Sequence, residues 1–131
     1  MVMKRVLIVG MLVLGFLPAW AQSGNLVDLV KESIKAGSAK ELAKHLNTSV
    51  DVTIDGKPET YSRAQAEFVL RDFFKVNPPS EFNIIHQGSS KGGQPFAIGQ
   101  YKSGDNTFRV WMKIKVSGNQ SFVQEISFVK E

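Results

Sequence analysis

The sequence predicts an α+β fold in which helices pack on an antiparallel sheet, and three observations carry this prediction. Segment 61–79 has a start signal, a long apolar stripe and a stop signal, as a central helix does. Two shorter helical patterns precede it. The other segments alternate between apolar and polar residues, which is typical of strands with one buried face. Every candidate partner for the central helix is therefore a strand.

Residues 1–21 have the pattern of a cleavable secretory signal. Basic residues precede an apolar run at 6–17, and the two alanines of Ala19-Trp20-Ala21 match a signal peptidase site. We expect cleavage before Gln22 and a single domain over 22–131. A retained membrane anchor is the alternative, and it is disfavoured because a spanning helix needs roughly 20 apolar residues.

The net charge and the absence of cysteine limit where the protein can be located and which classes of partner it can bind. The formal net charge is +4, and loss of Lys4 and Arg5 with the signal lowers it to about +2, too balanced to indicate nucleic acid or an anionic membrane as partner. The chain has no cysteine, which excludes disulfides, a thiol nucleophile and a lipid-modified N-terminal cysteine. We expect a periplasmic or secreted protein without stable membrane insertion after cleavage.

Two short helices are expected first. Asn25 is the expected cap of one and Gly37 its left-handed end. Ser38 and Glu41 form the expected capping box of the other, which should end near Asn47. Their apolar faces comprise Leu26, Leu29, Val30, Ser33 and Ile34, then Ala39, Leu42, Ala43 and Leu46.

A strand with Val50, Val52 and Ile54 on one side follows and turns at Asp55-Gly56, which suits a hairpin. The return segment 57–61 contains a proline and is expected at a sheet edge.

Ser62 and Gln65 form the expected capping box of the central helix, and Pro78 and Pro79 end it. Its apolar stripe comprises Ala66, Val69, Leu70, Phe73 and Phe74.

Four strands are expected after Pro79. In the first, Phe82, Ile84 and His86 should face the core, and the second runs from Phe96 to Tyr101. The third, 107–116, should bury Phe108, Val110, Met112, Ile114 and Val116. The fourth strand is expected from Phe122 to Val129. A loop of odd length, roughly 3 or 5 residues, between the third and fourth strands would set Val116 opposite Phe122, Met112 opposite Ile126, Val110 opposite Phe128 and Lys113 opposite Glu125. That register places Gln124 on the core side.

The blocks YSRAQAEFVLRDFFKVNPP, IIHQGSSKGGQPFAIGQY, TFRVWMKIK and VQEISF resemble a secreted domain-of-unknown-function family of Gram-negative bacteria. The element order over 25–131 is similar to the cone-shaped nuclear-transport-factor-two-like fold, also called cystatin-like. The resemblance implies a sheet curved around the central helix, sometimes with a pocket between them, and frequent dimerisation through the other sheet face. It implies no activity.

Candidate site residues are few. His86 could act in such a pocket with Tyr61, Gln100 and Gln124 as neighbours, but no carboxylate joins it to set its pKa. The loop 88–93 resembles a phosphate-binding loop, yet a strand rather than a helix follows it, so a hairpin loop is favoured. No spacing of ligands indicates a metal, no cofactor is implied, and no nucleophilic triad is recognisable.

The sheet face turned away from the central helix is the expected interface of a homodimer, with Ile85, Ala97, Tyr101, Trp111 and Val123 on it and Trp111 as anchor. The alternative is a monomer in which the stems of Arg109, Lys113 and Lys115 cover these residues. These cations around Trp111 could also bind a polyanion, although Glu125 should neutralise Lys113.

The leading functional hypothesis is therefore an exported, non-catalytic module that binds a periplasmic protein or a small apolar ligand. The rival is a small pocket enzyme, isomerase-like or dehydratase-like, that transfers a proton with His86. Convergent polar groups in a cavity would favour the rival.

Overall fold

The computed structural model describes residues 19–131, with side chains from Asn25 onward, so the first 18 residues of the expected signal lie outside it. The elements are α2 (Ala19–Lys35), α3 (Ala39–Ala43), β1 (Leu46–Ile54), β2 (Lys57–Ser62), α4 (Arg63–Val76), β3 (Glu81–Ser89), β4 (Pro95–Ser103), β5 (Asn106–Ser117) and β6 (Gln120–Lys130).

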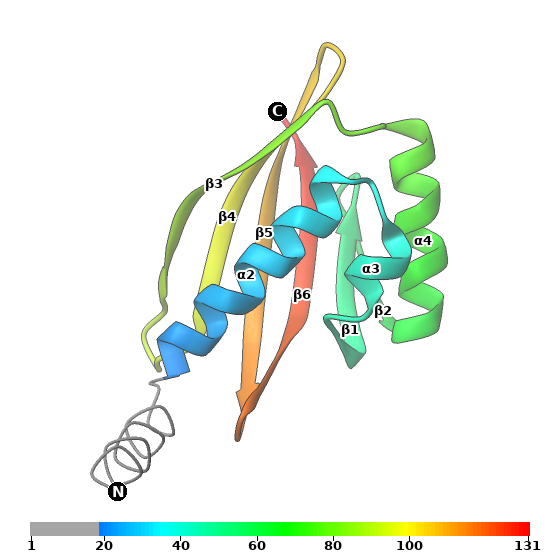
Figure 1. The fold of residues 1–131 in the computed structure, drawn as a ribbon. Coiled ribbons are helices and arrows are strands. Elements are labelled where there is room, and N and C mark those ends of the chain that lie inside the picture. Colours follow the sequence, from blue (N-terminus) through cyan, green and yellow to red (C-terminus); the bar gives the residue numbers. More distant parts are fainter. Residues whose placement is uncertain (1–18) are drawn as a thin grey trace, which may run out of the picture.

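The six strands form one sheet in the order β2-β1-β6-β5-β4-β3, and β2 lies at an edge as expected. Figure 1 shows α2 running obliquely across the central strands, while α4 stands beside β1 and β2. The sheet is curved and mixed rather than wholly antiparallel, because β1 pairs with β6 in parallel. After the β1–β2 hairpin the chain crosses through α4 to the far edge, so β6 meets β1 running in the same direction.

The N-terminal helices depart from expectation at their ends. Helix α2 begins before Asn25, which therefore lies inside it. Val27 is buried in place of Leu29, which is 51% exposed because it falls at the edge of the apolar stripe. Gly37 ends the helix with φ 64° as predicted. Leu46 begins β1 instead of closing the second helix.

Only one of the two hydrogen bonds of the expected capping box is present in α3. The Ser38 hydroxyl accepts the Glu41 N–H at 3.1 Å. The Glu41 carboxylate, however, pairs with Lys44 at 3.0 Å instead of completing a capping box.

Two turn and cap predictions are confirmed. Asp55 and Gly56 have φ 54° and 75° in the β1–β2 turn. Ser62 and Gln65 form the reciprocal capping box of α4, and Asn77 follows the last turn just before the two prolines. The buried face of α4 consists of Ala66, Leu70, Phe73 and Phe74, with Val69 partly buried beside them.

A bulge in β3 changes the face on which His86 lies. Ile84 pairs with Gly99 and His86 with Ile98, so Ile85 is the extra residue. Beyond the bulge, His86 lies on the exposed side of the sheet, which corrects the expected core position. Gly99 lies opposite this bulge, and a Cβ there would stand 2.5 Å from the Phe82 ring. The glycine thus lets the ring cross the strand where the sheet bends.

A second bulge lies in β6. Val116 pairs with Ser121 and Ile114 with Val123, whereas Met112 still pairs with Ile126. The expected odd loop is therefore wrong, because a two-residue turn is followed by the extra residue Gln124, which shifts the register by one. The expected pairs beyond the bulge are confirmed: Met112–Ile126, Val110–Phe128 and Lys113–Glu125.

Aromatic rings join α4 to the sheet. The Phe73 ring centroid lies 4.4 Å from that of Phe128, 5.3 Å from Phe108 and 5.6 Å from Tyr101. The Tyr101 hydroxyl donates to the Asn77 carbonyl, and burial raises the pKa of Tyr101. This cluster fills the space between the central helix and the sheet.

Replacing Phe73 by Ala should destabilise the fold by about 3–5 kcal/mol, because the cavity would remove contacts with three rings. Phe68→Ala is the matched control on the same helix, since Phe68 is 62% exposed. Its cost should stay within roughly 0.5–1 kcal/mol. Urea denaturation of both variants checks this, and equal midpoints would mean that the helix buries another face.

His45 lies between α3 and β1, and its carbonyl accepts the Val123 N–H at 2.8 Å. Burial lowers the pKa of its imidazole; Glu41 opposes this effect and Lys44 adds to it. A lowered pKa means that the folded protein binds a proton at His45 less readily than the unfolded chain does. The contribution of His45 to the unfolding free energy should therefore be fully present above about pH 6.5 and should be lost as the pH falls below that value.

His45→Gln should therefore reduce the stability difference between about pH 8 and about pH 5.5, a range that lies above most carboxyl titrations. Unfolding free energies of both proteins at the two pH values provide the measurement. A variant that keeps the full difference would show that another group controls it.

Candidate functional site

The residues expected around an interior pocket lie apart. Tyr61 is on the edge strand β2, where its hydroxyl donates to Glu59 at 2.7 Å. His86 and Gln100 lie on the sheet face opposite the helices, hereafter the outer face. Gln124 occupies the β6 bulge, where it is exposed and not on the core side as expected, and it accepts a hydrogen bond from the Gln94 amide at 2.8 Å. They form no common site, and aromatic rings occupy the interior.

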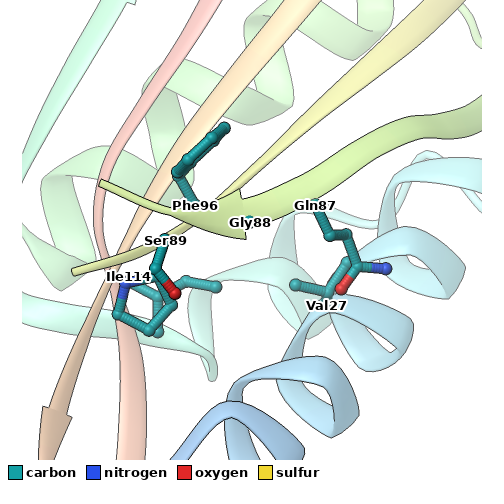
Figure 2. A pocket seen from close by; sticks show the side chains of 7 residues that line it. Val27, Gln87, Gly88, Ser89, Phe96 and Ile114 are labelled. Carbon is teal, nitrogen blue, oxygen red and sulfur yellow. The ribbon is translucent and has the colours of Figure 1, made fainter. Parts of the chain in front are cut away.

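A small cleft remains between α2 and the β3–β4 hairpin. Its volume is about 170 Å³, and Val27 and Ile114 form apolar parts of its wall. Figure 2 shows Gln87 and Ser89 bordering it, while the Phe96 ring points away from Val27. Ligand pockets usually measure roughly 300–1,000 Å³, so this cleft suits a small group at most.

The outer face carries an aromatic row. The Trp111 side chain is 41% exposed, and its ring stacks on Phe96 with centroids 5.6 Å apart and planes at 23°. The His86 ring lies 5.6 Å from Phe96 on the other side. An apolar notch of about 150 Å³ adjoins this row, with Ser90, Gln94 and Lys113 on its rim. Such a notch fits one apolar side chain of a partner.

The charges on the outer face are largely paired. Lys113 lies 3.3 Å from Glu125, and Arg109 lies 3.3 Å from Glu131. These exposed pairs add little stability. They do leave the surroundings of Trp111 close to neutral, which disfavours a polyanion as the partner.

The expected interface residues divide between the two faces. Ile85 and Trp111 are exposed as expected, whereas Ala97, Tyr101 and Val123 are fully buried. The β6 bulge moves Val123 inward. Tyr101 turns inward because the Asn77 carbonyl satisfies its hydroxyl in the core.

Phe96 and Ile98 take the places on the outer face that sequence reasoning gave to Ala97 and Tyr101. Ile98 pairs with Trp111, and Phe96 with Lys113. Both sides of β4 are apolar, so alternation alone could not assign its faces. The available signal was Gly99, which has no side chain and so indicates that a neighbouring group approaches the strand closely on that face.

The loop 88–93 belongs to the β3–β4 hairpin, as expected. Within residues 19–131, no group of three or more His, Cys, Asp or Glu side chains is placed to hold a metal ion. No helix in the described part is long and apolar enough to cross a membrane.

Similarity to known proteins covers most of the chain. Residues 27–128 match the model of a domain of unknown function, DUF4783. A DUF4783 family protein from Bacteroides uniformis ATCC 8492 is 28% identical with TM-score 0.73, over 79% of this chain and 95% of that one. One from Bacteroides ovatus ATCC 8483 gives the same identity and TM-score over 88% and 96%. A search of curated proteins finds no match.

The fold extends beyond the family. An NTF2-like protein of unknown function from Shewanella baltica OS155 aligns with TM-score 0.65 at 9% identity, over 86% of this chain and 93% of that one. At this identity the likeness concerns the fold alone. The chain belongs to the DUF4783 family and has the NTF2-like fold.

Proposed function

We propose that this chain is an exported, non-catalytic interaction module that binds a second copy of itself through the outer face of its sheet. The observation that carries the proposal is the half-exposed stack of Trp111 on Phe96. Removing the apolar surface of the two aromatic rings and the neighbouring Ile98 from water lowers the free energy, so their burial would favour association. The signal pattern at residues 1–21 supports export.

The size of the outer face suits a stable dimer. Six strands at about 4.8 Å spacing and a longest strand of 12 residues at about 3.3 Å per residue give a face on the order of 1,000 Å². A standard interface buries about 800 Å² per partner. Because Arg109 and Lys113 have acidic neighbours, the face around Trp111 can also meet its own copy without strong like-charge repulsion.

The rival hypothesis of proton transfer by His86 receives no support from the geometry. His86 is exposed to solvent, and its ring lies against Phe96 rather than in a cavity with a carboxylate. A general acid or base needs a partner that sets its pKa and a place for the reacting group. An interaction surface accounts better for an aromatic row that includes a histidine.

The test is the mass of the protein in solution. Light scattering on residues 22–131 at micromolar concentration should give a dimer, and Trp111→Glu should give a monomer because a carboxylate would be buried at the centre of the interface. Leu29→Glu on α2 is the matched control, since Leu29 is also exposed but lies on the helical side. It should remain a dimer.

A monomeric parent protein would overturn the proposal. Dissociation by Leu29→Glu with no effect of Trp111→Glu would place the interface on the helices instead.

A further inference from the structure

A wider cleft lies between α3 and α4, among the helices and not on the outer face of the sheet. Its volume is about 540 Å³, against about 170 Å³ for the cleft beside α2. Its lining residues are Lys40, Ala43, Lys44, Arg63, Ala64 and Glu67. Two alanines contribute only methyl groups, so the space between the two helices stays open where longer side chains would fill it. The stems of the long side chains add apolar surface.

The charges of this cleft are unbalanced, in contrast with the outer face. The Glu67 carboxylate is 2.7 Å from Arg71 and therefore already neutralised. Lys44 has Glu41 at 3.0 Å. Within residues 19–131, no ion pair involves Lys40 or Arg63. Two cations thus face the cleft without an acidic partner.

Arg63 is also held in position. Its Nε donates to the Leu46 carbonyl at 2.9 Å, and its guanidinium carbon lies 5.9 Å from the centre of the Phe122 ring. Neither contact brings a negatively charged side chain to the guanidinium. A guanidinium fixed in this way loses less side-chain entropy when it meets a carboxylate.

We propose that the α3–α4 cleft binds an acidic peptide segment of a partner protein. Carboxylates of that segment would pair with Lys40 and Arg63, while an apolar side chain between them would lie on Ala43 and Ala64. Charge complementarity favours this occupant. Nucleic acid is less suitable, because among the described residues the cleft offers only two cations without an acidic partner, fewer than a continuous row of phosphates would need. This surface is separate from the outer face, so either proposal can fail alone.

The test uses fluorescence anisotropy with a fluorescein-labelled Glu-Ala peptide and a Lys-Ala peptide of equal length, both titrated with residues 22–131. The Glu-Ala peptide should bind, and binding should weaken as salt is raised. The double variant Lys40→Glu/Lys44→Glu should weaken binding about tenfold, since Lys40 becomes repulsive and the loss of Lys44 leaves the Glu41 carboxylate unpaired beside the cleft. Both lysines are exposed, and circular dichroism checks that the variant folds.

Lys57→Glu/Lys130→Glu is the matched control, because it makes the same charge change at exposed positions outside the cleft. It should keep most of the affinity. Equal losses in the two double variants would show attraction to net charge only and would overturn the proposal. Equal binding of the Lys-Ala peptide, or tighter binding of a single-stranded oligonucleotide at the same salt concentration, would overturn it as well.

Discussion

Phe73 lies where the rings of Tyr101, Phe108 and Phe128 converge, and this contact joins the central helix to three neighbouring strands of the sheet. The sheet is curved, and its three rings lie on the neighbouring strands β4, β5 and β6, within reach of the same helix residue. They bury large apolar areas and gain further from edge-to-face contacts, such as that between Phe73 and Phe108. The cluster fills the interior, so the surfaces available for binding lie outside it.

The curvature has identifiable causes in the strands. In β3 the extra residue Ile85 bends the edge, and opposite it Gly99 leaves room for the Phe82 ring. In β6 the extra residue Gln124 reverses the faces between the turn and the rest of the strand. These bulges decide which side chains reach the outer face. The β3 bulge places His86 beside Phe96 on the outer face, and the β6 bulge turns Val123 inward.

The parts of the structure that could be predicted from the sequence are those determined within a few residues. The capping box of Ser62 and Gln65, the Asp55-Gly56 turn and the Gly37 helix end all depend on local geometry, and all are present. The two bulges depend on pairing with a neighbouring strand, and the sequence leaves the faces open there, because Ile84 and Ile85 are both apolar, as are Phe122 and Val123. Consequently the fold and the exposure of Trp111 were predictable, whereas the faces of His86, Tyr101 and Val123 were not. The α3–α4 cleft was also missed, because its lining comes from two helices with separate patterns.

The central claim is that the bend at Gly99 holds the aromatic interior and the outer face in place, and the unfolding free energy of Gly99→Ala tests it most directly. The added methyl would stand 2.5 Å from the Phe82 ring and 3.1 Å from the Asn83 carbonyl. We predict a loss of about 1–3 kcal/mol, although alanine normally stabilises a strand relative to glycine. Gly88→Ala is the reference, since its methyl would meet the partly exposed Phe96 ring at 3.3 Å and His86 Nε2 at 3.5 Å, without the 2.5 Å overlap found at Gly99. A Gly99→Ala protein as stable as the parent or as Gly88→Ala would contradict the claim.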